Sequence, residues 1–345
     1  MELSLTKVIV IIAILGTVAY FGNQIKSKYT SENFLYEYKL VKEYVLNESP
    51  IYSHSKPKIW IHTKYELNAR KWRDFGTRNT TDLNQPYLHL TIQSMIRHCG
   101  NDFHILLIDD DSFPKLLDDW SYDLSSMHGK EKDIYRQYAL AKMIWKYGGI
   151  LVPNSYLCLH SLLPVWNQYA HTKKPFVFEM PNRTSGMEVN RNFVPDMTFL
   201  GCGESNNEKM MEFLNFLYKR VSEVHKSAEN EFEGDIPSWL HIAVHRGIFD
   251  LISGDVIGVK TNKRNKPICI EDWMEEKDID LSEKCCGIFI PAEEILRRPK
   301  YQWFASLHTT DILKSNMILS KYMRQATLQE PLSDDSGVWK SDSCM

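Results

Sequence analysis

Two side chains near the middle of the chain have the types and the spacing to bind a charged, hydroxylated ligand. Asp133 and Arg136 lie three residues apart at the start of a periodic apolar stretch, 133–147, so a helix would bring them close together on one face. A carboxylate can accept hydrogen bonds from ribose hydroxyls, and a guanidinium can bind a diphosphate through two parallel hydrogen bonds. The competing interpretation is a structural ion pair worth only a few tenths of a kcal/mol.

A run of carboxylates forms a second candidate site. The run Asp109-Asp110-Asp111-Ser112 directly follows an apolar stretch, 103–108, that predicts a buried strand. Open α/β sheets bind ligands at the carboxyl ends of their strands, and carboxylate oxygens suit Mg²⁺ or Mn²⁺. Asp109 and Asp111 are therefore candidate metal ligands. In the competing interpretation, which we prefer, Asp111 or Ser112 caps a helix predicted at 113–120 and the other carboxylates are solvated.

The apolar pattern indicates the elements that position these groups. Residues 133–147 have the periodicity of a helix with its apolar side packed inward. Gly148-Gly149 end this helix, because glycine readily adopts the left-handed conformation found at helix C-termini. Residues 150–152 continue as a short apolar strand, which Pro153-Asn154-Ser155 end.

Further strands and helices alternate along the chain, which predicts an α/β fold. Strands are expected at 58–62, 103–108, 175–179, 193–200 and 288–290, and helices at 85–98 and 210–225.

The stretch 133–159 resembles the centre of the sugar-nucleotide glycosyltransferases with a DXD motif, a superfamily that includes the capsular-polysaccharide-synthesis type. In that family a helix with Asp-x-x-Arg leads into Tyr-Gly-Gly-Ile-x-x and then Asp-x-Asp. This chain has Asp133-x-x-Arg136 and Tyr147-Gly148-Gly149-Ile150. The resemblance implies a GT-A-like fold, which is a Rossmann-related mixed sheet flanked by helices, preceded by an N-terminal transmembrane helix.

The chain departs from the family pattern in two places. Pro153 and Ser155 occupy the positions of the two motif aspartates. The family's helix Asp and Arg would fall on Gln137 and Leu140, so the Asp-x-x-Arg of this chain lies four residues earlier, about one helical turn or roughly 6 Å away. The implied fold is not affected by these departures, whereas the implied catalytic residues are incomplete.

The same resemblance implicates residues elsewhere in the chain. The segment PKIWIHTK, 57–64, resembles the family's opening strand, whose end touches the nucleotide base, and residues 288–308 resemble its closing block, where basic residues and a histidine approach the donor phosphates. The resemblance thus implies a donor-binding set of His62, Asp133, Arg136, Gly148, Gly149, Asn154, Arg297 and His308. An ordinary hydrogen bond also explains a lone histidine at a strand end, and glycines at a tight turn need no ligand.

The resemblance implies an enzyme that transfers a sugar from a nucleotide-sugar donor to a glycan or another acceptor. A divalent cation, Mn²⁺ or Mg²⁺, would neutralise the leaving diphosphate, a task that fixed positive charge from Arg136 with Arg297 or Lys260 could also perform. The alternative is a membrane protein that keeps the fold and binds carbohydrate or acts as a scaffold without transferring a sugar.

Composition and charge narrow the class of protein. The 345 residues are 43% hydrophobic and 25% charged, which is typical of a globular protein, and a net charge of -3 gives no general nucleic-acid footprint. Seven cysteines without a C-x-x-C pair argue against a zinc ribbon or a thioredoxin-type site. Their odd number suits either a reducing compartment or a lumen with one or two disulfides. Sequons at Asn47, Asn79 and Asn182 permit glycosylation in a lumen.

The N-terminal region contains an uncharged apolar run, Val8 to Phe21. A spanning helix needs about 20 apolar residues, so a cleaved signal peptide competes with an uncleaved signal anchor, which we prefer. We expect a transmembrane helix at 1–22, a stem at 23–56, a GT-A-like domain at 57–326 and a disordered tail at 327–345. The family resemblance implies a single-pass protein of the secretory pathway with its N-terminus in the cytosol, the type II orientation.

Overall fold

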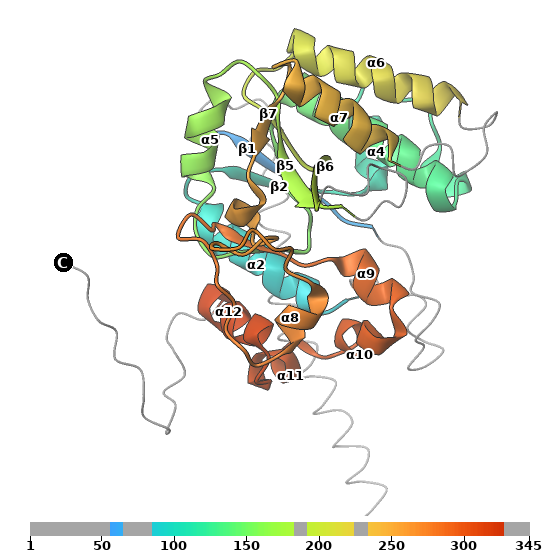
Figure 1. The fold of residues 1–345 in the computed structure, drawn as a ribbon. Coiled ribbons are helices and arrows are strands. Elements are labelled where there is room, and N and C mark those ends of the chain that lie inside the picture. Colours follow the sequence, from blue (N-terminus) through green and yellow to red (C-terminus); the bar gives the residue numbers. More distant parts are fainter. Residues whose placement is uncertain (1–55, 65–84, 183–191, 224–233, 328–345) are drawn as a thin grey trace, which may run out of the picture. The chain divides into compact units, whose positions relative to one another are not determined.

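The computed structural model describes residues 56–64, 85–182, 192–223 and 234–327, which all belong to one compact unit, Ile51–Met345. The expected membrane helix, nearly all of the expected stem and tail, and the sequons at Asn47 and Asn79 lie outside the described residues. Among the helices of the described part, none is both long and apolar enough to cross a membrane. What is described is a mixed α/β structure (Figure 1).

A six-stranded mixed sheet forms the centre of the described residues, with the strand order β2-β1-β3-β6-β5-β7. Its strands are β1 (Lys58–His62), β2 (His104–Ile108), β3 (Gly149–Leu151), β5 (Phe176–Pro181), β6 (Phe193–Cys202) and β7 (Asp250–Ile252). Strand β6 runs antiparallel to both neighbours, whereas the pairs β1–β2, β1–β3 and β5–β7 are parallel. The carboxyl ends of the five parallel strands therefore lie along one edge, where open α/β sheets bind ligands.

Strand β1 lies between two parallel neighbours, and its central residues Ile59, Trp60 and Ile61 are all buried. A strand with both faces covered carries a continuous apolar run rather than an alternating one, as this strand does. Its register sets His62 beside Ile108 at the carboxyl edge of the sheet. The end of β1 is thus brought next to the aspartate run that follows β2.

Helices cover both faces of the sheet. The longer ones are α2 (Tyr87–Cys99), α4 (Gly129–Tyr147), α5 (Leu163–Ala170), α6 (Glu208–Glu223), α7 (Asp235–His245) and α12 (Ile318–Thr327). The crossovers β1-α2-β2 and β2-α4-β3 step in opposite directions along the sheet, so right-handed connections place α2 and α4 on opposite faces. Figure 1 shows α4, α6 and α7 grouped on one side, where they share a core with Trp60 and Leu200, and α2 with the C-terminal helices on the other. The predicted α/β fold, a mixed sheet flanked by helices, is confirmed.

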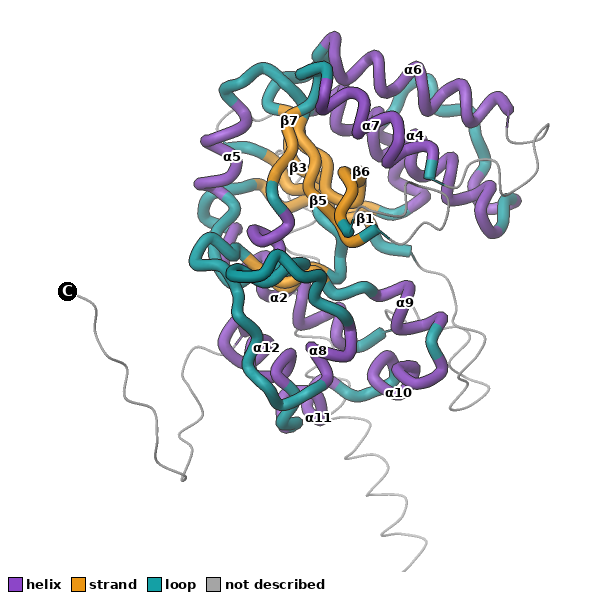
Figure 2. Tube along the Cα trace, in the orientation of Figure 1, coloured by secondary structure: helices purple, strands orange, loops and turns teal. Residues whose placement is uncertain are grey.

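A second core lies around α2 and the C-terminal third of the chain. A two-stranded antiparallel sheet, β4 (Tyr156–Cys158) with β8 (Gly287–Phe289), packs here against α2. Short helices connected by long loops complete this part (Figure 2), and they are α8 (Ile270–Met274), α9 (Ala292–Arg297), α10 (Gln302–Ala305) and α11 (Thr309–Lys314). A further short helix, α3 (Phe113–Leu116), packs in the first core.

The central helix begins earlier than the sequence pattern predicts. The apolar periodicity starts at Asp133, but α4 begins at Gly129. Lysine and glutamate are good helix formers, so Lys130, Glu131 and Lys132 extend the helix by one turn without apolar residues. Asp133 and Arg136 therefore lie inside the helix, and Lys132 joins them.

The helix predicted at 113–120 is shorter than expected. A 3₁₀ turn, Asp110–Ser112, leads into α3, which ends at Leu116. Asp118 and Asp119 lie beyond that end and pair with two lysines of α4. These two residues therefore form ion pairs with α4 and do not belong to α3.

Candidate functional site

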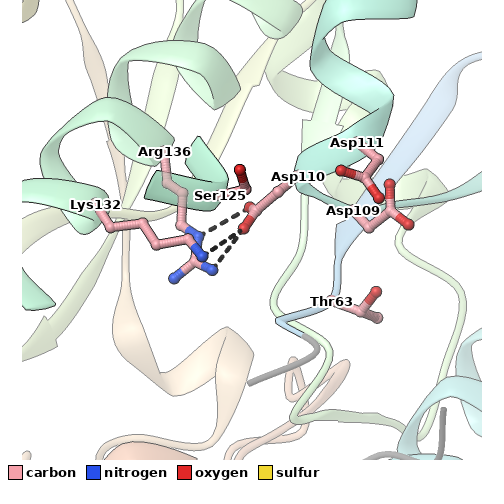
Figure 3. A pocket seen from close by; sticks show the side chains of 7 residues that line it. All are labelled: Thr63, Asp109, Asp110, Asp111, Ser125, Lys132 and Arg136. Carbon is pink, nitrogen blue, oxygen red and sulfur yellow. Dashed lines mark hydrogen bonds and ion pairs between the residues drawn. The ribbon is translucent and has the colours of Figure 1, made fainter. Parts of the chain in front are cut away.

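A small polar pocket lies at the carboxyl edge of β1 and β2, beside the first two turns of α4. Its volume is about 170 Å³. The side chains that line it come from both strand ends, from the 3₁₀ turns Asp110–Ser112 and Leu124–Ser126, and from α4 (Figure 3). They are Thr63, Asp109, Asp110, Asp111, Ser125, Lys132 and Arg136. Two groups that are separate in the sequence, the aspartate run and the start of the central helix, therefore meet in one pocket.

Asp110 is the centre of this site. Its Oδ1 accepts a hydrogen bond from Arg136 Nε at 2.9 Å, and its Oδ2 accepts one from Arg136 Nη2 at 2.7 Å. His62 Nε2 lies 3.0 Å from the same Oδ1, and Lys132 Nζ lies 3.5 Å from Oδ2. We call these four residues the Asp110 cluster. The Arg136 side chain is only 4% exposed, so this two-point pair holds a buried guanidinium in one orientation.

The electrostatics of the cluster keep Asp110 ionised. Burial alone raises the pKa of its carboxyl, but the hydrogen bonds from His62 and Arg136 and the positive charge of Arg136 outweigh burial, and the net pKa lies far below its usual range. At neutral pH, Asp110 is therefore a carboxylate that accepts hydrogen bonds from both partners.

His62 is a neutral imidazole at physiological pH. Burial lowers its pKa, and the nearby charges of Arg136 and Lys64 lower it further against the opposing effect of Asp110. Because Asp110 is ionised and can only accept, Nε2 of His62 is the protonated nitrogen and donates to it. The imidazole ring stacks on Phe113, with ring centroids 5.4 Å apart. The hydrogen bond and the stacking together account for the position of His62.

A second set of ion pairs extends from Arg136 of the Asp110 cluster toward α9. Lys64 Nζ is 3.1 Å from Asp133 Oδ1 and 3.0 Å from Glu293 Oε1, and Arg136 Nη1 is 3.4 Å from Asp133 Oδ1. Burial lowers the pKa of Lys64, but attraction to Glu293 and Asp133 outweighs burial and raises it. Asp133 thus joins the cluster to α9 through Lys64.

The predicted metal ligands line the pocket but have other surroundings. Asp109 Oδ1 accepts a hydrogen bond from Ser112 Oγ at 2.6 Å, and the Asp109 side chain caps the 3₁₀ turn. Asp109 is thus the N-cap of the 3₁₀ turn, while Ser112 is the N-cap residue of α3, one of the two positions that the sequence pattern predicted, although its side chain makes no capping hydrogen bond to α3. Within the described ranges, no group of three or more His, Cys, Asp or Glu side chains is placed to hold a metal ion. Metal binding by Asp109 and Asp111 stays a prediction.

The two walls of the pocket differ in charge. Figure 3 shows Arg136 and Lys132 reaching toward Asp110 from α4, while the carboxylates of Asp109 and Asp111 lie on the other side. A basic wall can donate hydrogen bonds to phosphate oxygens, and a carboxylate wall can accept hydrogen bonds from hydroxyl groups. The pocket is suited to a ligand that carries both.

Gly148 and Gly149 are not among the residues that line the pocket. Gly149 has φ of 102°, and a Cβ there would lie 2.5 Å from the Lys58 carbonyl oxygen. Trp60 Nε1 donates to the Gly148 carbonyl at 2.9 Å. These glycines lie at the amino end of β3, about 13 Å along β1 from its carboxyl end. Close packing against β1 explains them.

Asn154 lies in the turn after β3 and is likewise not among the pocket residues. Its carbonyl accepts a hydrogen bond from Thr91 Oγ1 of α2 at 2.5 Å. The next residue, Ser155, is buried, and its carbonyl accepts from the Ile290 amide at 3.1 Å. The turn that replaces the family's two aspartates thus connects β3 to the second core.

The last two predicted donor-binding residues belong to the C-terminal helices. Arg297 is 78% exposed and pairs with Glu293, Nη2 to Oε2, at 3.5 Å. His308 is the N-cap of α11, where its Nδ1 accepts a hydrogen bond from the Thr310 amide. Arg297 is joined to the Asp110 cluster through Glu293, Lys64 and Asp133, whereas His308 has a local structural role.

Two residues of the Asp110 cluster, Asp110 and Lys132, were not predicted from the sequence, nor were Thr63 and Ser125 of the pocket. Asp110 lies between the two aspartates chosen as metal ligands, and the sequence does not show which of the three points toward α4. Lys132 precedes Arg136 by four residues, a spacing that places both on one helical face. Recognising that the helix begins at Gly129 would have identified Lys132.

Comparisons with known proteins give little further information. No protein-family description matches the chain, and no curated protein matches it. One solved structure with some similarity is described as "PaToxG Glycosyltransferase". It has a TM-score of 0.30 and 11% sequence identity to this chain, over 56% of this chain and 70% of its own. A similarity this low does not establish a shared fold or a shared function.

Proposed function

We propose that the chain binds a nucleotide sugar in this pocket and transfers the sugar to a glycan or another acceptor. The observation that carries the proposal is the pair of pocket walls, with Arg136 and Lys132 oriented by Asp110 and facing Asp109 and Asp111. A sugar nucleotide has an anionic diphosphate and a ribose with two hydroxyl groups, which are the groups these walls suit. The position at the carboxyl edge of parallel strands supports the same proposal.

Sugar transfer requires positive charge beside the leaving diphosphate. The bond between the anomeric carbon and the diphosphate oxygen breaks, and the diphosphate leaves with the electron pair. The acceptor's hydroxyl oxygen bonds to the anomeric carbon and loses its proton to solvent water. Arg136 and Lys132 would stabilise the charge that develops on the diphosphate. Because Asp110 already fixes the Arg136 guanidinium, little reorganisation is needed when that charge develops.

A divalent cation is another source of this charge, and the described residues offer few ligands for one. In the turn after β3, Pro153 has no side-chain oxygen and Ser155 is buried. Asp109 and Asp111 remain the proposed ligands, since Mg²⁺ is often held by one or two carboxylates together with substrate phosphates. The described residues do not form a complete metal site, so we assign no step of the transfer to a metal.

A second candidate function is donor or carbohydrate binding without transfer. The observation in its favour is the same turn, whose backbone and buried serine build the fold rather than reach toward a ligand. No described residue is assigned as the base that takes the acceptor's proton. A protein of this kind would retain the pocket and lack the chemical step.

Heat stability with and without donors tests the binding proposal. The purified full chain is melted alone and with a panel of UDP- and GDP-sugars, each with and without Mn²⁺. A donor at 100 times its Kd should add about 2.7 kcal/mol to the free energy of unfolding. Arg136→Ala should lose the donor-induced shift relative to its own baseline, because the phosphate partner is gone. Arg297→Ala is the matched control and should keep the shift, since Arg297 lies outside the pocket.

The outcomes separate the two candidates. Donor-induced stabilisation with release of the nucleoside diphosphate, lost together in Arg136→Ala, supports transfer. Stabilisation without release of the diphosphate, even with a mixture of glycan acceptors, supports binding alone. No stabilisation by any donor on the panel would show that the pocket does not bind nucleotide sugars.

We also propose that residues 1–22 anchor the protein in a membrane of the secretory pathway, in the type II orientation. The proposal rests on the apolar run Val8 to Phe21. Fractionation of cells that express the full chain or a chain lacking residues 1–22 tests it. The full chain should resist extraction by carbonate, and the shortened chain should not.

A further inference from the structure

Four of the cysteines in the described part of the chain gather where α2 meets the β4–β8 sheet. Cys99 is the last residue of α2, Cys158 is the last residue of β4, and Cys285 and Cys286 directly precede β8. All four side chains are buried. None belongs to the pocket described above, so an inference from them is independent of the proposed function.

Within this group, Cys99 and Cys158 directly face each other. Their Sγ atoms are 3.6 Å apart, and both residues have no exposed surface. An approach of about 1.5 Å would bring the sulfur atoms to the length of a disulfide bond. Cys158 also donates to the His160 carbonyl at 3.1 Å. The other two thiols donate only to backbone carbonyls among the contacts of the described residues, Cys285 to Gly287 at 3.1 Å and Cys286 to Lys284 at 3.6 Å.

The two thiols lie at the end of a contact that is already held in place by hydrogen bonds. Thr91 of α2 donates to the Asn154 carbonyl at 2.5 Å, and Ser94 Oγ accepts from the Cys158 amide at 2.8 Å. These bonds set the position of α2 along the segment 154–158. The backbones that carry the two sulfur atoms therefore need little movement to be joined.

The two thiols are also unequal in acidity. The hydrogen-bonding contact between the two thiols lowers the pKa of Cys99, and the same contact raises the pKa of Cys158. In a thiol–disulfide exchange the thiolate is the attacking form.

We propose that Cys99 and Cys158 form a disulfide that covalently joins α2 to β4. The oxidant is a disulfide of another molecule, such as oxidised glutathione. Both thiols are fully buried, so the exchange takes place while the contact between α2 and β4 is open, as it is during folding. The Cys99 thiolate then attacks one sulfur of this oxidant, the oxidant's S–S bond breaks, and one thiol leaves. Cys158 then loses its proton and attacks the Cys99 sulfur of the mixed disulfide, which releases the second thiol. Two protein thiols are oxidised and one disulfide is reduced to two thiols, so the electrons balance.

The bond would close a long loop of the chain. Cys99 and Cys158 are 59 residues apart, and the loop between them contains β2, α4 and β3. A crosslink of this kind stabilises a protein mainly by restricting its unfolded chain. For a loop of this length in a domain of this size, we expect the unfolding midpoint to rise by roughly 5–10 °C.

Peptide mapping of the purified full chain tests the proposal. The chain is kept in a series of reduced and oxidised glutathione buffers until its thiol content is constant. It is then quenched with acid, alkylated in denaturant, digested without reductant and analysed by mass spectrometry. In oxidising buffers we expect a peptide pair joined through Cys99 and Cys158, and a higher unfolding midpoint than in reducing buffers. Cys286→Ala, the matched control from the same cluster, should keep both results.

Substitution of either partner should remove both effects. In Cys99→Ala and Cys158→Ala, the glutathione-dependent rise of the midpoint should disappear. If either variant does not fold, the mapping of the unsubstituted chain still decides. The proposal is overturned if Cys99 and Cys158 are both alkylated in the most oxidising buffer, or if Cys158 is found joined to Cys286.

Discussion

The Asp110 cluster lies at the carboxyl end of β1, and the segment from Gly148 to Ser155, which contains β3 and the turn after it, packs beside β1 from its amino end. Different forces hold these two regions in place. In the cluster, one carboxylate accepts hydrogen bonds from a buried arginine and a neutral histidine at the carboxyl end of β1. In the turn, a glycine packs against the Lys58 carbonyl at the amino end of β1, and backbone carbonyls accept hydrogen bonds from α2 and from the chain after β8. The first region is stabilised by charged hydrogen bonds and borders a pocket, whereas the second is stabilised by close packing and backbone hydrogen bonds.

The comparison shows that residues of one sequence motif can have unrelated physical roles. Asp133, Arg136 and the following glycines belong to the same stretch, but of these residues only Arg136 lines the pocket at the carboxyl edge of the sheet. Substitutions in the packed segment should therefore lower the free energy of unfolding through steric clashes. Substitutions in the cluster should lower it by an amount that depends on the charges of the side chains, and so on pH.

The largest effect is expected for Gly149→Ala. The new Cβ would lie 2.5 Å from the Lys58 carbonyl oxygen, at a residue whose φ is 102°. The clash and the backbone strain should lower the free energy of unfolding by roughly 3–5 kcal/mol, as measured by urea denaturation.

Gly129→Ala is the matched control for this substitution. Gly129 also has positive φ, but no atom lies within 4 Å of a Cβ built there. Its loss should be only about 1 kcal/mol, from backbone strain alone. Equal losses in the two variants would contradict the explanation by packing.

Asp110→Asn should destabilise the protein somewhat less. The amide cannot accept both guanidinium hydrogen bonds, which leaves the buried charge of Arg136 without its partner. A loss of about 2–3 kcal/mol at pH 7 is expected in urea denaturation.

The difference in free energy of unfolding between the unsubstituted chain and Asp110→Asn should also depend on pH. The pKa of Asp110 is depressed in the folded state, so its contribution is fully present above the pKa of an unfolded aspartate, about 3.9. As pH falls below that value, the unfolded chain takes up a proton that the folded chain does not, and the difference should shrink. A difference that stays constant from pH 7 to pH 3 would refute the ionic explanation.

His62→Gln should change the slope of stability against pH. The pKa of His62 is lowered in the folded state, so its neutral form favours folding above the pKa of an unfolded histidine, about 6.5. Below that pH the unfolded chain is protonated first, and the stability provided by His62 is lost. Glutamine can still donate to Asp110 but does not titrate here. Urea midpoints between pH 8 and pH 5 should therefore fall more steeply for the unsubstituted chain than for the variant.

The smallest effect is expected for Lys64→Ala. Lys64 joins Asp133 and Glu293, but its side chain is 39% exposed and both partners are more exposed still. Pairs of this kind contribute under about 1 kcal/mol, and salt screens them. The loss should be measurable in low salt and should vanish in high salt. A loss as large as that of Asp110→Asn would mean that the outer pairs belong to the buried cluster.

Much of the fold could be predicted from local patterns. The buried run of β1, the periodicity of α2 and α4, and the glycine break before β3 all follow from side-chain types that repeat over short distances. The start of α4 was predicted one turn late, because charged helix formers extend a helix without adding an apolar signal. The family resemblance and the membrane helix remain predictions.

The sequence by itself determined that this chain is an α/β protein with carboxylates and an arginine placed near element ends. Only the tertiary structure decided which of these groups meet. The register of β1 with β2 brings His62 to the aspartate run, and the crossover through α4 brings Arg136 to Asp110 rather than to Asp109 or Asp111. Asp110 is 26 positions from Arg136 and 48 positions from His62 in the sequence, and no local pattern encodes contacts over such separations. The pairing of Cys99 with Cys158 was decided in the same way, because the packing of α2 on β4 brings together two thiols that are far apart in the sequence.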